Sequence, residues 1–103
     1  MARKRIKAGR KVPLTFTARE RTLLLDHTFA EPELTDTLAE ARPVAAGYEV
    51  RYSLHDLEEL MGHVAAEANH SKDRKLQKEL DALHERLQRV MEAYDDGNWQ
   101  TVL

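Results

Sequence analysis

Hydrophobic and polar residues alternate in two short segments of the chain, with the period of a half-buried β-strand. The first segment covers residues 12–16, where three apolar side chains flank Pro13 and Thr15. Because proline cannot donate to a sheet, this segment is expected to be an edge strand or a strand start. The second segment covers residues 48–52 and follows Gly47. We expect the two to pair as a small two-stranded sheet, of parallel or antiparallel sense, that lies on helices or is extended by another copy of the chain.

Two short helices are predicted between these strands. Thr17 and Glu20 have the spacing of a capping box, which opens a helix that ends at about Thr28. Pro32 occupies a first-turn position and opens a second helix, which ends near Ala41. The two short helices could form a helix-turn-helix motif, in which the second helix would be the recognition helix. That helix would bring acidic side chains against the phosphates of DNA, so we do not expect this motif to read DNA.

A longer amphipathic pattern over residues 54–96 predicts an antiparallel helical hairpin. Ser53 and Asp56 are expected to cap its first helix, which runs to about Asn69. Ser71 is expected to cap the second helix. The connection between the two helices consists of only a few residues, around Asn69 to Ser71. Helices joined by so short a connection can only fold back on each other.

The second helix of the hairpin carries a coiled-coil seam, spaced 4-3-4-3-4, that consists of Leu76, Leu80, Leu83, Leu87, Val90 and Tyr94. This helix is longer than its partner, so the turns containing Val90, Met91 and Tyr94 project past it and need another surface. The first helices of the chain are one candidate. A second copy is the other, because charges such as Glu79 and Arg86 flank the seam as they do in helical dimers. We therefore predict a homodimer.

The fold class that follows is α+β, mostly α: a two-stranded sheet with two short helices, then a long helical hairpin. With 103 residues and 42% hydrophobic composition, the chain has enough apolar surface for one core. Residues 1–11 are expected to form a flexible basic arm and residues 12–103 a single globular domain. Gly97 is expected to end the last helix, and Trp99 and Leu103 are expected to pack on the body or on a partner chain.

The chain has no cysteine, which excludes disulfides and thiolate metal sites and favours a reducing, cytoplasmic compartment. We expect neither a secretion signal nor a membrane-spanning segment, because no long apolar run occurs.

Charge is unevenly distributed, although the net charge is only −2. The remainder of the chain has ten basic residues against eighteen acidic ones, while the first eleven residues contain six bases and no acid: Arg3, Lys4, Arg5, Lys7, Arg10 and Lys11. Such an arm can follow a nucleic-acid backbone by displacing counterions. The alternative is a solvated start of the chain that keeps the protein soluble or lies against its own acidic surface.

The tip of the hairpin is a second candidate site. Basic residues crowd the first turn of the last helix, where the helix dipole favours an anion. With neighbouring polar groups they would converge on a phosphate, a nucleic-acid backbone or an acidic segment of a protein partner: Asn69, His70, Ser71, Lys72, Arg74 and Lys75. In the alternative interpretation these side chains extend into solvent and Lys75 pairs with Glu79.

Metal binding and catalysis receive little support. Glu67 and His70 have the spacing of a di-iron motif, but hairpin geometry separates them from Asp81 and His84 by roughly 15 Å. His63, Glu67 and His70 fit a surface zinc site, although histidines among acids are more often a solvated face. No acid, base and nucleophile are placed for mutual contact. We therefore expect no metal, no cofactor and no enzymatic activity.

Two functions remain. The first is a non-enzymatic interaction or regulatory module that acts through the helical hairpin on an unidentified protein partner and self-associates. The second is an accessory nucleic-acid-binding protein that uses the basic arm. Salt dependence separates them, because phosphate binding weakens steeply with salt while an apolar helical interface does not.

Overall fold

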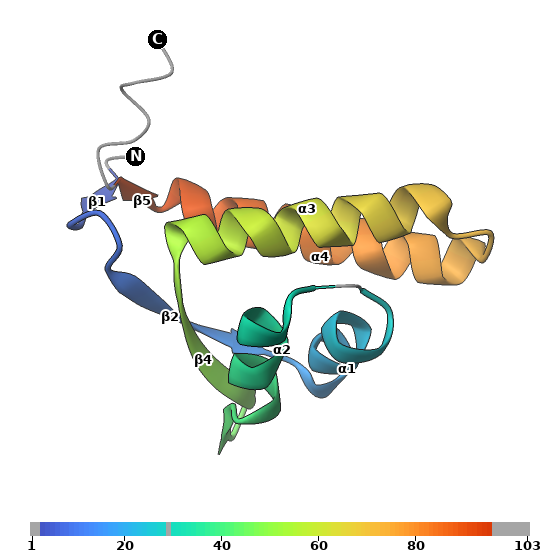
Figure 1. Ribbon diagram of the computed structural model, residues 1–103, viewed down its shortest axis with the longest axis horizontal. Helices are drawn as coiled ribbons and strands as arrows, with labels where there is room; N and C mark the ends of the chain where they lie inside the picture. The colour runs from blue at the N-terminus through green and yellow to red at the C-terminus, as the bar shows by residue number, and fades with distance from the viewer. Residues whose placement is uncertain (1–2, 29, 96–103) are drawn as a thin grey trace, which may run out of the picture.

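The computed structural model describes residues 3–28 and 30–95. It confirms the α+β class with mostly helical content and a small sheet. The elements are, in chain order, β1 (Lys4–Arg5), β2 (Lys11–Phe16), α1 (Ala18–Asp26), α2 (Pro32–Ala39), β3 (Arg42–Val44), β4 (Gly47–Ser53), α3 (Leu54–His70), α4 (Arg74–Glu92) and β5 (Tyr94–Asp95). Helices α3 and α4 lie side by side as a hairpin, with the sheet, α1 and α2 gathered along one side of it (Figure 1).

The predicted pairing of residues 12–16 with 48–52 is confirmed, and its sense is antiparallel. Phe16 lies opposite Tyr48 and Val12 opposite Tyr52, so the apolar faces of β2 and β4 coincide. The sheet has three strands rather than the expected two, in the order β2-β4-β3. No strand was predicted after the second helix, which was expected to end near Ala41, because β3 is too short to show an alternating pattern.

A tight turn at residues 45–46 joins β3 to β4 and depends on the glycine that follows it. Gly47 has a φ of +143°, a conformation that residues with a side chain rarely adopt. Its backbone also passes so close to β2 that a Cβ atom would overlap the carbonyl oxygen of Phe16. This position therefore requires glycine for two independent reasons.

A second, parallel strand pair joins the two ends of the described chain, and sequence analysis did not predict it. The Lys4 backbone N–H donates to the Ala93 carbonyl at 2.9 Å, and the Ile6 N–H donates to the Asp95 carbonyl at 2.9 Å. Strands β1 and β5 lie beside the open end of the helical hairpin (Figure 1). The basic arm thus begins on the folded body and returns to it at β2.

Both predicted capping boxes are present. Thr17 with Glu20 caps α1, and Ser53 with Asp56 caps α3. The predicted cap of the last helix was wrong, because Ser71 instead terminates α3 and Asp73 caps α4. The Asp73 carboxylate accepts from two backbone N–H groups of the first turn, which a serine hydroxyl at position 71 does not reach.

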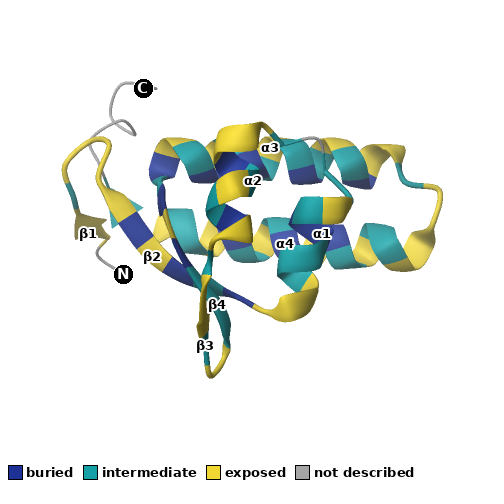
Figure 2. Cartoon of the chain, turned by 60° about the horizontal axis from the view of Figure 1, so that its bottom comes forward, coloured by how far each residue is buried: buried dark blue, intermediate teal, exposed yellow. Residues whose placement is uncertain are grey.

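One hydrophobic core lies between the hairpin and the layer formed by the sheet, α1 and α2, and Figure 2 shows the buried residues on the facing sides of these elements. The predicted seam of α4 is confirmed at its centre, where Leu80, Leu83 and Leu87 are buried. Its predicted end, near residue 96, was wrong, because α4 ends at Glu92 and Tyr94 pairs with β1 as part of β5. Val90, Met91 and Tyr94 are half-buried against the same core. They are thus packed within the chain, and the homodimer stays a prediction. Gly97, Trp99 and Leu103 lie outside the described residues.

Two side chains fasten α2 to its neighbours. Arg21 donates to the carbonyl oxygens of Leu38 and Ala39 at 2.9 and 3.1 Å, so α1 supplies the cap for the end of α2. Tyr52 is 1% exposed and its hydroxyl donates to the Leu34 carbonyl at 2.6 Å. Burial raises the pKa of Tyr52, which keeps the hydroxyl protonated as a donor.

Gly47→Ala is expected to lower the free energy of unfolding by about 2 kcal/mol or more, because the substitution adds backbone strain and a steric overlap. Chemical denaturation measures this change. The matched control is Gly62→Ala in α3, where a Cβ atom meets nothing within 4 Å. Alanine there should raise stability by roughly 0.5–1 kcal/mol. Equal stabilities for the two variants would contradict the close approach of Gly47 to β2.

Candidate functional site

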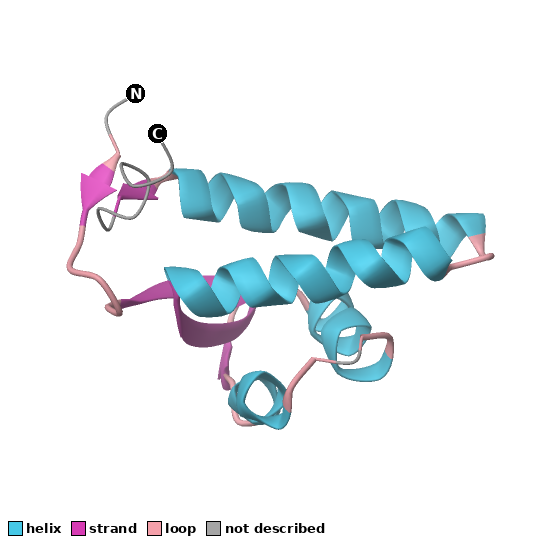
Figure 3. Ribbon diagram, turned by 45° about the horizontal axis from the view of Figure 1, so that its top comes forward, coloured by secondary structure: helices cyan, strands magenta, loops and turns pink. Residues whose placement is uncertain are grey.

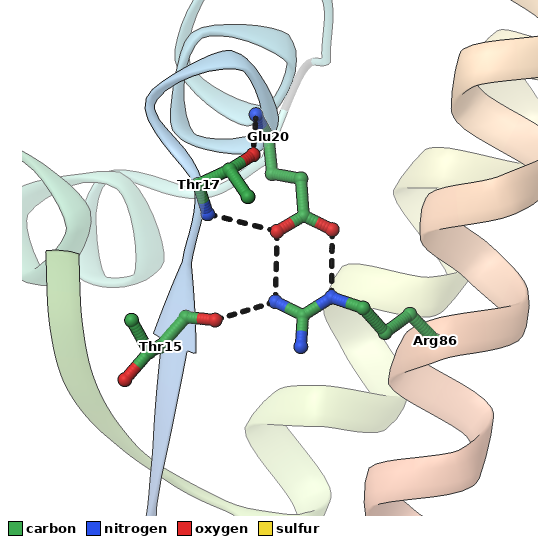
Figure 4. A network of polar contacts seen from close by, with 4 residues as sticks. All are labelled: Thr15, Thr17, Glu20 and Arg86. Atoms are coloured by element: carbon green, nitrogen blue, oxygen red, sulfur yellow. Dashed lines mark hydrogen bonds and ion pairs between the residues drawn. The ribbon is translucent and has the colours of Figure 1, made fainter. Parts of the chain in front are cut away.

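The most extensive set of polar contacts in the described chain joins α4 to the corner between β2 and α1 (Figure 4). Arg86 donates from Nε and Nη2 to the two carboxylate oxygens of Glu20, at 2.7 and 2.8 Å. The same Nη2 donates to the Thr15 carbonyl at 2.6 Å, and the guanidinium lies 5.6 Å from the centre of the Phe16 ring. We call this set, formed by Thr15, Thr17, Glu20 and Arg86, the Arg86 junction.

The carboxylate of Glu20 is also part of the capping box at the start of α1. It accepts from the Thr17 backbone N–H at 2.9 Å, while the Glu20 N–H donates to the Thr17 hydroxyl at 3.1 Å. Partial burial acts to raise the pKa of Glu20, but hydrogen bonds from Arg86 and Thr17 together with the Arg86 charge outweigh it. They hold the pKa below its usual value of 4.5.

These contacts identify the Arg86 junction as structural rather than chemical. Both oxygens of Glu20 are engaged by groups of the chain itself, and the ionised carboxylate is the stabilised form. No buried side-chain nitrogen or oxygen in the described residues lacks a hydrogen-bond partner. The junction therefore offers no group in an unusual state that a substrate would use.

The charges that flank the α4 seam have partners within the chain. Arg19 binds the carboxylate of Glu79 with two hydrogen bonds, at 2.7 and 2.9 Å, and Arg86 binds Glu20. Glu79 thus pairs with α1, and not with Lys75 as the solvated interpretation of the hairpin tip expected. Sequence analysis missed both pairs because their members lie 60 and 66 residues apart and no local spacing relates them.

The basic arm, residues 3–11, contains six basic residues and no acidic one. All six of its basic side chains are exposed. Among the residues that the structure describes, five of them make no ion pair or side-chain hydrogen bond: Lys4, Arg5, Lys7, Arg10 and Lys11. Their charge is therefore available to a ligand.

A turn shapes the middle of the arm. The Arg10 N–H donates to the Lys7 carbonyl at 3.1 Å, and Gly9 has a φ of +82°. A positive φ at the third residue is what a type II turn requires, and glycine adopts it without strain. The turn brings Lys7 and Arg10 close together, between the two points at which β1 and β2 attach the arm to the body.

The hairpin tip is exposed, but its polar groups already bind each other. The Ser71 hydroxyl accepts from the Asp73 N–H and donates to the Asp73 carbonyl, both at 3.2 Å. The carboxylate of Asp73 accepts from the N–H groups of Lys75 and Leu76 at 2.9 and 3.3 Å. The helix terminus is thus supplied with an anion by the chain itself. The side chains of the remaining residues are exposed: Asn69, His70, Lys72, Arg74 and Lys75. An anion site at the tip stays a prediction.

The candidate metal ligands do not form a centre. Among the described residues no three histidine or acidic side chains are placed to hold a metal ion. His63 and Glu67 are half-buried on α3, whereas His70 is exposed at its end. On α4, Asp81 is exposed and His84 is half-buried. The zinc hypothesis from residues 63, 67 and 70 is therefore not supported.

No family model matches the chain, and no curated protein and no solved structure matches it. Within the described residues, no helix has both the length and the apolar character needed to cross a membrane.

The Arg86 junction predicts an acid-sensitive contribution to stability. Below pH 4.5 the unfolded chain protonates Glu20 while the folded chain still holds it ionised, so the free energy of unfolding falls as the pH drops through the lowered folded-state pKa. At pH values well above 4.5 Glu20 is ionised in both the folded and the unfolded chain, and the junction contributes its full stabilisation. Glu20→Gln should lower stability at neutral pH by about 1–2 kcal/mol and flatten the profile at acidic pH.

Denaturation curves recorded between neutral and acidic pH measure this contribution. Glu79→Gln is the matched control, because its partner Arg19 is 53% exposed and solvent screens the pair. It should change stability less than Glu20→Gln does. If the two variants have the same stability and the same pH profile, the Arg86 junction does not hold the corner of β2 and α1 as described.

Proposed function

We propose that this chain is a cytoplasmic, non-enzymatic accessory protein that binds nucleic acid through its basic arm. The observation that supports this proposal is the state of the arm: its bases are exposed, five of them have no side-chain partner among the described residues, and both ends of the arm are attached to the body. A basic segment of this kind gains binding free energy when it displaces the counterions condensed on phosphates.

The rest of the chain favours one orientation on a polyanion. Outside the first eleven residues, acidic residues exceed basic ones by eight, so phosphates repel the body as a whole and attract the arm. Attachment at β1 and β2 also limits the conformational entropy that the arm loses on binding. Both effects favour binding at the arm without sequence-specific contacts.

The other function expected from the sequence, an interaction module that acts through the helical hairpin, has weaker support. Its apolar seam is buried at Leu80, Leu83 and Leu87, within the chain's own core. The flanking charges Glu79 and Arg86 are paired within the chain as well. A protein partner would have to bind the polar outer surface of the hairpin, and no feature of the described residues favours binding there.

Replacing Lys7, Arg10 and Lys11 with glutamine tests the proposal. The triple variant removes three charges whose side chains are exposed, so it should fold as the parent does. Its affinity for DNA at low salt should fall ~10-fold or more, and the slope of log K against log salt should become shallower by about 3. Fluorescence anisotropy with labelled DNA measures both quantities.

The matched control replaces Lys72, Arg74 and Lys78 with glutamine, which is an equal loss of charge on exposed side chains at the opposite end of the hairpin. This variant should bind as the parent does. Unaltered binding by the arm variant would contradict the proposal. A selective loss in the control variant would place the anion site at the hairpin tip instead, and failure of the parent chain to bind DNA at low salt would remove the function altogether.

A further inference from the structure

The outer face of the β2-β4-β3 sheet carries Lys11 of the arm and two further bases that were not among the predicted site residues. Residues that lie directly opposite in an antiparallel ladder share a face, and every second residue along a strand does so too. Arg51 pairs with Pro13, and Lys11 is two residues from Pro13 on the same strand. Arg42 pairs with Glu49, which is two residues from Arg51. Lys11, Arg51 and Arg42 therefore share one face of the sheet.

This face is turned away from the core. The apolar residues of the alternate register, such as Val12, Val50 and Tyr52, are buried, whereas the three bases are exposed. Within the described part of the chain, none of the three forms an ion pair or a side-chain hydrogen bond. Diagonal neighbours on a sheet lie about 7–8 Å apart, so Lys11 and Arg51 belong to one local cluster of charge.

The cluster continues the basic arm. Lys11 is both the last base of the arm and the first residue of β2. The connection from β1 runs into β2 at the end of the molecule away from the hairpin tip (Figures 1 and 2). Along β2 exposed and buried residues alternate, as Figure 2 shows, so the exposed ones belong to one face. The opposite end is the hairpin tip, as the coloured ribbon in Figure 3 also shows. We define the basic surface as the arm, residues 3–11, together with Arg42 and Arg51.

The side chains of the basic surface are suited to contacts with the phosphates of a duplex rather than to stacking with the bases of a single strand. Single-strand binding usually relies on aromatic side chains on which bases stack. The aromatic residues of β2 and β4, which are Phe16, Tyr48 and Tyr52, belong to the opposite face of the sheet, and Arg21 lies 4.5 Å from the centre of the Tyr48 ring. Besides Pro13 and Thr15, the outer face carries charged side chains, and such groups contact phosphates without reading bases.

We propose that Arg42 and Arg51 are phosphate-contacting residues, and that the basic surface binds the backbone of double-stranded nucleic acid independently of sequence. This inference rests on the proposed function and extends it from the arm to the sheet. Glu49, which is half-buried on the same face, opposes binding because its charge repels phosphate. Besides Lys11, which also belongs to the arm, the sheet thus presents two favourable charges and one unfavourable charge, and each can be removed separately.

The experiment measures the affinity of the full chain for a DNA duplex and for one of its strands, as a function of salt, by fluorescence anisotropy. The double variant Arg42→Gln with Arg51→Gln should bind the duplex ~10-fold more weakly at low salt, with a slope shallower by about 2. Glu49→Gln, on the same face, should bind the duplex more tightly than the parent does. The parent should prefer the duplex to the single strand. Circular dichroism melting checks that the variants remain folded, since Arg42 and Arg51 are exposed but Glu49 is half-buried.

The outcomes separate this inference from the proposed function. If the arm variant binds weakly while the sheet double variant binds as the parent does, the sheet is not part of the interface and the inference fails, although the arm still binds. Tighter binding of the single strand than of the duplex would overturn the choice of ligand. Absence of any parent binding at low salt would overturn both proposals together.

Discussion

The arrangement of this molecule depends on the Arg86 junction. The side chain of Arg86 on α4 binds Glu20 at the start of α1 and the Thr15 carbonyl near the end of β2, so one residue joins the hairpin to both elements of the opposing layer. Hydrogen bonds to charged groups are stronger than those between neutral groups, and removal of one member leaves the other charge uncompensated. The junction thus fixes the direction of β2 and, through the ladder, that of β4.

Fixing β2 also fixes the basic surface, because the arm leads directly into that strand. At its other end the arm is attached to β5, which follows the C-terminal end of α4. The bases between these two points therefore belong to a short connection that is held at both ends. Such a segment has fewer conformations to lose on binding than a free tail of the same composition. The backbone of β2 thus links the Arg86 junction to the position of the basic residues of the arm.

Sequence patterns were sufficient for the elements that depend on local order. The alternation in β2 and β4, the capping boxes at Thr17 and Ser53, and the spacing of apolar residues in α4 each reflect contacts that recur within a few residues. Long-range features left no such pattern. Strands β1, β3 and β5 have two or three residues each, too few to show a period.

The basic surface, too, was only partly predictable from local sequence patterns. The exposed bases of the arm were evident from composition, but their attachment at β5 was not. The alternation in residues 48–52 already placed Arg51 opposite its apolar neighbours, so its outward position was readable from the sequence. That Arg51 lies beside Lys11 depends on the register with β2, and that Arg42 belongs to the same face depends on β3. Both facts required the structure.

Mapping of backbone amides by NMR during titration with a short DNA duplex tests the central claim most directly, because it locates the contact without any substitution. Resonances of β1, of the turn from Lys7 to Arg10, and of the residues around Arg42 and Arg51 should shift together, with the same apparent affinity. Amides of the hairpin tip, at residues 69–75, should stay in place. Shifts concentrated at the tip or along the outer surface of α3 and α4, with the arm and sheet unaffected, would contradict the account.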